Sequence, residues 1–371
     1  MAKQLVFLPG PVMVSQAVLD AMSRPLVDHR GPEFAAMLAR LIDALRPIYG
    51  TSGEIAVLGS SGTGALEAAV VNLFSPGERL LSCAVGAFGK RLAAIARAYG
   101  CEVESLDTSP GAALDPQALR GRLESDTERR IDGILLTQNE TSTGVANDMA
   151  AIAPIVRAHG ALSVVDAVSG LGASEFKMDE WGFDAVASAS QKAFAAPPGV
   201  AMIALSARGL ARCKERRLPR FYLDLNQAFE FARKGQTPWT PPISVLFALD
   251  VALQRYHAAG MSQMFARHVA DAQEIRETLH GFGFNLFSQP GAHSDTVVAV
   301  YPPEGIAVSP MLKTLRERDN VIISDGQGEL SGKIVRFGTM GDFTHEELET
   351  ALDAVGRAAN ALTRDVAGST A

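Results

Sequence analysis

Short apolar runs alternate with helix-like stretches between about residues 50 and 250. Most of the runs are continuous and β-branched, which is typical of strands that are buried on both faces of a sheet. The predicted strands are Ile55–Leu58, Arg79–Cys83, Ile131–Leu136, Leu162–Val165, Ala185–Ser188 and Val200–Leu205, with helices such as Ala65–Phe74 and Lys90–Tyr99 between them. This alternation predicts an α/β fold with a mostly parallel central sheet flanked by helices.

The pattern changes beyond about residue 253. A long helical stretch, Met261–Leu279, is followed by shorter mixed segments that include Thr296–Tyr301 and Lys333–Phe337. This change predicts a smaller C-terminal α+β domain. The first twenty or so residues, which contain Pro9-Gly10-Pro11, fit no strand or helix of the main sheet and could lie across either domain. The predicted division is an N-terminal segment (1–20), a large domain (21–255) and a small domain (256–371).

The composition of the 371 residues is that of an ordinary globular protein, with 47% hydrophobic and 20% charged residues. The net charge is −7 and no long basic run occurs, so nucleic acid is not expected as a partner. Cys83, Cys101 and Cys213 form no metal-binding or disulfide pattern, which fits a reducing cytoplasm. Nothing approaches the roughly 20 apolar residues that a bilayer span needs, so we expect a soluble, cytoplasmic protein without a membrane partner.

A glycine-rich loop, Gly59-Ser60-Ser61-Gly62-Thr63-Gly64, comes directly after one predicted strand and directly before a helix. Backbone N–H groups at the positive end of a helix suit a phosphate. The loop lacks the Gly-Lys-Ser/Thr of a Walker loop and the third glycine of a dinucleotide fingerprint. Phosphate binding and a plain tight turn both remain open for this loop taken alone.

Two charged side chains follow neighbouring predicted strands. Asp166 ends the run Leu162–Val165, at the sheet edge where ligands bind in open α/β folds, although it could instead cap the next turn. Lys192 follows the run Ala185–Ser188, about one strand–helix–strand unit later, so both side chains could reach the same edge. A solvated surface lysine is the alternative, but the Ala and Phe neighbours of Lys192 argue against it.

A phosphate-binding helix start, a carboxylate at a strand end and a lysine on the neighbouring loop are what pyridoxal phosphate chemistry needs. The lysine forms a Schiff base with the aldehyde, and the carboxylate keeps the pyridine nitrogen protonated so that the ring accepts electrons. Phe88 would offer a flat apolar face to the ring, with a core aromatic as the alternative. The set therefore indicates pyridoxal 5′-phosphate as the cofactor.

Ordered segments along nearly the whole chain carry a resemblance to a known family. They are Leu8-Pro9-Gly10-Pro11, Asp28–Phe34, Ser61–Glu67, Asn139–Gly144, Val165–Ser169, Ser190–Ala193 with Pro197–Gly199, Gly235–Pro241 and Gly332–Gly338. With these segments the chain resembles the class V (fold type I) aminotransferases, and most closely their alanine:glyoxylate and serine:pyruvate group. The resemblance implies a fold type I transferase that depends on pyridoxal phosphate.

The resemblance also implies a role for individual residues. Lys192 would form the Schiff base and Asp166 would pair with the pyridine nitrogen. The other implied contacts are Ser61, Gly62, Thr63 and Gln191 at the phosphate, Phe88 on the ring, Thr141 near the phenolic oxygen, Thr240 at the phosphate of the neighbouring subunit and Arg336 at the substrate α-carboxylate. A homodimer with shared active sites follows from the role of Thr240. No role is assigned to His29, Arg30 or Thr237, and no metal is expected.

The implied reaction moves an amino group from alanine or serine to glyoxylate or pyruvate by a ping-pong mechanism, with Lys192 also acting as general base. No second arginine is evident for a side-chain carboxylate, which favours these small donors. An aminotransferase for an unusual amine, such as an aminophosphonate, ureidoglycine or pyridoxamine, is an alternative. A cysteine desulfurase-like lyase is a less favoured alternative, because it needs a mobile nucleophilic cysteine and usually a histidine at the position of Gln191. A catalytically silent scaffold relative and a nucleotide-binding α/β enzyme are further alternatives.

Overall fold

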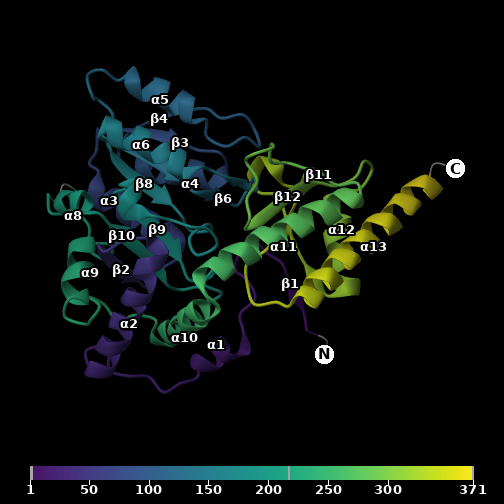
Figure 1. Ribbon diagram of the computed structural model, residues 1–371, viewed down its shortest axis with the longest axis horizontal. Coiled ribbons are helices and arrows are strands. Elements are labelled where there is room, and N and C mark those ends of the chain that lie inside the picture. The colour runs from purple at the N-terminus through teal and green to yellow at the C-terminus, as the bar shows by residue number, and fades with distance from the viewer. Residues whose placement is uncertain (1–2, 216–217, 370–371) are drawn as a thin grey trace.

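The computed structural model describes residues 3–215 and 218–369. A seven-stranded sheet lies at the centre of the larger part of the molecule (Figure 1). Its order is β2 (Glu54–Leu58), β10 (Ala201–Leu205), β9 (Ala185–Ala189), β8 (Leu162–Asp166), β5 (Gly133–Thr137), β3 (Arg79–Cys83) and β4 (Glu102–Ser105). Only β10 pairs antiparallel with its neighbours β2 and β9, so the predicted mostly parallel sheet is confirmed.

Helices cover both faces of this sheet. Alternate strand residues point to opposite sides, and apolar residues on both sides are buried under the helices. One face packs against α2 (Pro32–Tyr49), α5 (Pro116–Glu124), α6 (Met149–His159) and α10 (Ile243–Ala259). The other face packs against α3 (Gly62–Leu73), α4 (Ala87–Ala98), α8 (Ala207–Cys213) and α9 (Leu225–Ala232). The short helix α7 (Met178–Trp181) and the hairpin of β6 (Asn139–Glu140) with β7 (Val145–Ala146) complete this part. The fold is thus the predicted α/β arrangement.

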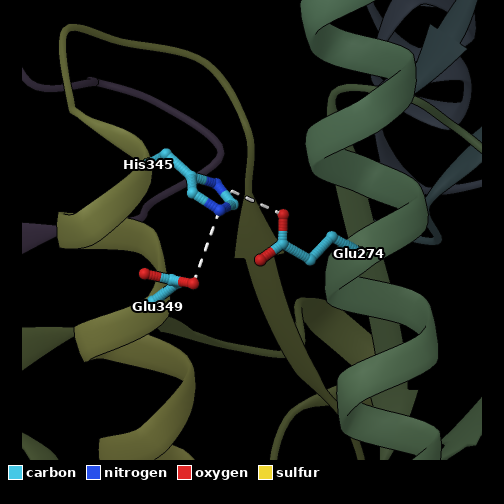
Figure 2. A group of neighbouring side chains, drawn as sticks. All are labelled: Glu274, His345 and Glu349. Atoms are coloured by element: carbon cyan, nitrogen blue, oxygen red, sulfur yellow. Dashed lines mark ion pairs between the residues drawn. The ribbon is translucent and has the colours of Figure 1, made fainter.

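The smaller part contains a four-stranded sheet that consists of β11 (Asn285–Leu286), β12 (Val297–Tyr301), β15 (Val335–Gly338) and β14 (Ser324–Asp325). The helices are α11 (Met261–Gly281), α12 (Val308–Thr314) and α13 (His345–Ser369), with a π-helical turn Leu315–Asp319 after α12 and a 3₁₀ turn Gly328–Leu330 after β14. His345 at the start of α13 lies 3.5 Å from Glu274 of α11 and 3.5 Å from Glu349 (Figure 2). The contact with Glu274 joins α13 to α11, whereas the contact with Glu349 lies within α13.

The N-terminal segment crosses from the smaller part to the larger one. Its strand β1 (Leu5–Val6) pairs in parallel with β13 (Val321–Ile322), and Phe7 packs against Phe337 with ring centroids 4.8 Å apart. Its helix α1 (Gln16–Ala21) then contributes to the core of the larger part. The segment therefore passes the edge of the central sheet on the way, which brings Pro9 and Gly10 to the candidate site.

The domain boundaries at residues 20 and 255 stay predictions. Residue 255 lies within α10, which continues to Ala259, and α11 begins at Met261. Residues 1, 2, 216, 217, 370 and 371 of the predicted segments lie outside the described residues. Within residues 3–215 and 218–369, no helix combines the length and the apolar character needed to cross a membrane.

Candidate active site

The carboxyl ends of β8 and β9 bring Asp166 and Lys192 to one edge of the central sheet. Asp166 is the last residue of β8, and Lys192 lies three residues beyond the end of β9, which pairs in parallel with β8. Both charged side chains are buried, with 4% of Asp166 and 8% of Lys192 exposed. A buried lysine next to a buried carboxylate is costly to fold, and such pairs are common in functional sites. The alternative of a solvated lysine is therefore wrong.

The Lys192 amine points at the N-terminal segment. Its Nζ donates a hydrogen bond of 2.8 Å to the carbonyl oxygen of Pro9. Gly10 follows with φ +128°, and a Cβ there would lie only 2.4 Å from Nζ. Only glycine fits this backbone conformation and this close approach. The Pro9-Gly10-Pro11 turn, which has no place in the main sheet, therefore forms one wall around the lysine.

The site changes the pKa of both groups. Burial lowers the pKa of Lys192 to about 8, aided by the charges of Arg336 and Arg91 and opposed by Asp166. Burial raises the pKa of Asp166 to about 6, aided by Glu140. The hydrogen bond from the Val168 N–H, 3.0 Å from Oδ1, and the charges of Lys192 and Arg91 act against that rise. At neutral pH, Asp166 is mainly ionised and a fraction of Lys192 is neutral.

The start of α3 lies against the ends of β8 and β9. A Cβ on Gly62 would be 2.8 Å from Val168 Cγ2 and 3.3 Å from Ala189 Cβ, so a larger residue would separate the helix from the sheet. The side chain of the N-cap residue Ser61 makes no capping hydrogen bond, which leaves the first N–H groups of the helix available. The side-chain oxygen of Gln191 is buried without a hydrogen-bond partner among the described residues. The uncapped N–H groups fit a phosphate, which Gln191 would contact through its amide N–H rather than through this oxygen.

Glu140 holds the loop that carries Phe88. Its carboxylate is fully buried and accepts hydrogen bonds from the backbone N–H groups of Phe88 (3.1 Å) and Gly89 (3.0 Å) at the start of α4. It also accepts from the N–H (3.1 Å) and the hydroxyl (2.6 Å) of Ser142. A carboxylate at a helix N-terminus is stabilised by the helix dipole. Glu140 therefore fixes the position of the Phe88 ring, a role that sequence reasoning did not identify although the residue lies in the segment Asn139–Gly144.

Arg336 reaches the site from the small sheet. It lies on β15 between β12 and β14, and only 9% of the residue is exposed, so the alternative of a surface arginine on an edge strand is wrong. Its Nη1 donates to the carbonyl oxygen of Thr141 (3.1 Å) and its Nε to that of Asp325 (2.8 Å). Burial lowers the pKa of Arg336, against the effects of Asp325 and Glu140. The Thr141 hydroxyl donates to Ser169 Oγ at 2.8 Å, beside the end of β8.

The segment Gly235–Pro241 lies beside the start of the glycine-rich loop, where Thr240 and Gly59 line one cavity. Thr240 is exposed, and the Thr237 hydroxyl donates to the carbonyl oxygen of Trp239 at 2.7 Å. Arg30 donates to Gln236 Oε1 (2.9 Å) and to the carbonyl oxygen of Pro238 (3.2 Å), so it supports this segment. His29 contacts Phe34 edge to face. The described residues thus bring together every other predicted site residue, while the roles of Thr240 and Thr237 stay untested within one chain.

Comparison with known proteins assigns the family. Residues 20–349 match the family described as Aminotransferase class-V. The chain is 34% identical to a soluble hydrogenase small subunit of Synechococcus sp., over 95% of this chain and 92% of the relative. It is 33% identical to an L-aspartate–glyoxylate aminotransferase of Paracoccus denitrificans, over 91% and 87%. An alanine–glyoxylate aminotransferase of Nostoc sp. has a similar structure, with a TM-score of 0.91, 29% identity and 96% of each chain covered.

The chain therefore belongs to the class V aminotransferases, a family of transaminases that depend on pyridoxal phosphate. The predicted family, the fold type I architecture and the enzyme class are confirmed. The roles of the individual site residues stay predictions, which the geometry above supports through Lys192, Asp166 and the start of α3.

Proposed function

We propose that this aminotransferase moves the amino group of alanine or serine to glyoxylate or pyruvate. The observation that carries the proposal is the buried pair of Lys192 and Asp166 with Arg336 beside it, whose charge acts on Lys192. Lys192 would hold the cofactor aldehyde and Asp166 the ring nitrogen. The further cofactor contacts are Ser61, Gly62, Thr63 and Gln191 at the phosphate, Phe88 on the ring face and Thr141 near the phenolic oxygen. Pyridoxal phosphate supplies, when bound, a ring that accepts the electrons of the substrate Cα–H bond.

The protein groups provide the proton transfers and the orientation. Lys192 is the base that takes the proton from the substrate α-carbon, and a pKa lowered by burial to about 8 makes it partly neutral at physiological pH. The Pro9 carbonyl oxygen, 2.8 Å from Nζ, keeps the amine inside the site. Asp166 stays mainly ionised at neutral pH and so retains a proton on the ring nitrogen. Arg336 binds the α-carboxylate, for which its planar fork is suited.

The charges around Lys192 favour a small donor. Among the described residues, Arg336 and Arg91 are the arginines whose charges act on Lys192. Arg91 lies next to Thr63 of α3, so of these two arginines of the described residues Arg336 is the one left for the substrate. A donor with a second carboxylate would lack a partner there, which disfavours aspartate even though one relative is named for it. Glyoxylate as acceptor agrees with the names of two of the relatives above.

We further propose a homodimer in which Thr240 reaches the phosphate of the partner subunit. The side chains next to this residue form an exposed aromatic surface, with Phe221 71% and Tyr222 54% exposed. Both rings pack on Trp239, at centroid distances of 4.6 Å and 6.1 Å. Large exposed aromatic groups are typical of interfaces. Mixed dimers of Lys192→Ala and Thr240→Ala subunits test the sharing, because one of their two sites should then be complete.

The cysteine desulfurase alternative is disfavoured by the thiols. Cys83, Cys101 and Cys213 are all buried, and burial raises their pKa to about 12, about 11 and about 12. Such thiols are protonated at physiological pH and are poor nucleophiles. Their buried, unpaired state also fits the cytoplasm, where we place the protein. A silent scaffold would have no use for Lys192 and Asp166, whose burial costs folding free energy.

Steady-state kinetics with a panel of donors test the proposal. Alanine and serine with glyoxylate should give parallel double-reciprocal lines, as expected of a ping-pong mechanism. Aspartate should be a weak donor. Pyridoxamine, an aminophosphonate and ureidoglycine represent the unusual amines, and a clear preference for one of them over alanine and serine would replace the proposed substrates. Intersecting lines would contradict the ping-pong scheme.

A further inference from the structure

The predicted phosphate site lacks a positive side chain. Ser61, Gly62, Thr63, Gln191 and Thr240 offer N–H, hydroxyl and amide groups, all of which are uncharged. A phosphate monoester carries a charge of about −1.5 to −2 near pH 7. Helix N-termini balance only a fraction of a charge each. A cationic side chain at this place would therefore add strongly to the affinity for the phosphate.

Arg91 of α4 is the cationic side chain that the fold brings there. Its Nη1 lies 3.5 Å from the hydroxyl of Thr63, in the first turn of α3. Its guanidinium also lies over the Phe88 ring, 4.6 Å from the ring centroid. Arg91 is only partly exposed, and it forms no ion pair with a carboxylate within the part of the chain that the structure describes. Its charge is therefore not neutralised by a protein carboxylate.

The charge of Arg91 acts on Lys192 and Asp166, the two groups at the centre of the site. After the larger effect of burial, it is among the charges that lower the pKa of Lys192 and that oppose the raised pKa of Asp166. Both groups thus lie within electrostatic range of the guanidinium. Its short distance to Thr63 places the guanidinium beside the residues that we predict to hold the phosphate.

We propose that Arg91 supplies the positive charge that balances the cofactor phosphate, and that it thereby makes the site prefer pyridoxal phosphate to pyridoxal. This inference rests on the proposed function and adds a residue to its phosphate site. The contact of Arg91 with Phe88 offers a competing role, in which the arginine only holds the ring in position. The two roles differ in their effect on binding affinity. A correctly held ring strengthens the binding of both pyridoxal phosphate and pyridoxal, whereas the positive charge strengthens only the binding of pyridoxal phosphate.

The test compares the binding of pyridoxal phosphate and pyridoxal to the apoprotein by titration calorimetry. Arg91→Gln should weaken pyridoxal phosphate binding by about tenfold or more and change pyridoxal binding by less than about twofold. Arg91→Lys keeps the charge and should recover most of the affinity for pyridoxal phosphate. Lys90→Gln is the matched control, since it removes the same charge from an exposed neighbour on the same helix, and it should change neither affinity.

Salt dependence provides a second readout. Raising the ionic strength from about 50 to about 500 mM should weaken pyridoxal phosphate binding to the wild-type protein more than to Arg91→Gln. Equal losses for both ligands in Arg91→Gln, or unchanged pyridoxal phosphate affinity in a folded variant, would overturn the role of Arg91. Should Arg91→Gln fail to fold, a wild-type affinity without salt dependence would overturn it as well. A wild-type protein that binds neither ligand would instead contradict the proposed function.

Discussion

Replacement of Gly10 by alanine should damage catalysis far more than stability. Gly10 has φ +128°, and a Cβ there would lie 2.4 Å from Lys192 Nζ and 2.7 Å from both Cδ and Cε. The lysine side chain therefore has to move away from the N-terminal segment. The move breaks the 2.8 Å hydrogen bond to the Pro9 carbonyl oxygen, which holds the amine in place.

Two magnitudes follow from this geometry. An ordinary contact begins at 3.4 Å, so the lysine side chain has to shift by about 1 Å. A misplacement of about 1 Å at a reacting group can cost about 100-fold in rate. The positive φ itself costs an alanine about 1–2 kcal/mol of folding free energy. We therefore expect Gly10→Ala to lose about 100-fold in kcat with a modest loss of stability.

Gly77→Ala is the matched control. Gly77 also has a positive φ, +82°, but a Cβ there meets nothing within 4 Å. It should show a similar loss of stability in urea unfolding and a wild-type kcat with alanine and glyoxylate. A Gly10→Ala enzyme that turns over at the wild-type rate would refute the reasoning, because the lysine would then tolerate the displacement.

Three further perturbations test other parts of the site. Arg336→Gln should raise KM for alanine by roughly 100-fold while pyridoxal phosphate content, read from its absorbance, stays normal. Glu140→Gln replaces an acceptor of four hydrogen bonds and should cost about 2–3 kcal/mol in urea unfolding, because buried donors lose their partner. Since burial lowers the pKa of Lys192 to about 8, half of the amine is neutral at that pH and nearly all of it about one unit higher. Stopped-flow attachment of pyridoxal phosphate to the apoprotein should therefore accelerate steeply up to about pH 8 and level off near about pH 9; a steady rise to pH 10 would contradict the lowered pKa.

The sequence pattern predicts the central sheet closely because its strands are buried. Each strand predicted for this sheet is present, shifted by at most two residues at either end. The edge strand β4, with the sequence Glu-Val-Glu-Ser, was missed, because exposed edge positions need no apolar residue. The path of residues 1–20 was left open and is now seen to use both parts of the molecule.

The chemical centre of the site was also visible in the sequence, whereas its supports were not. Asp166 and Lys192 follow adjacent strands, so strand order alone brings them together. The role of Arg336 had to be inferred from the family resemblance, since its apolar neighbours indicate a strand but not what the arginine binds. The contacts of Pro9, Glu140 and Arg91 join segments that are distant along the chain, as in the bond from Lys192 to Pro9. Such contacts depend on tertiary packing that periodicity does not specify.

The visible absorption spectrum of the purified protein tests the central claim most directly. The wild-type protein with pyridoxal phosphate should show a yellow band that fades with L-alanine and returns with glyoxylate, and Lys192→Ala should lack the band of the lysine-bound cofactor. This result would establish a transaminating site built on Lys192. A colourless protein that takes up no pyridoxal phosphate, or a Lys192→Ala variant with the wild-type spectrum, would contradict the account.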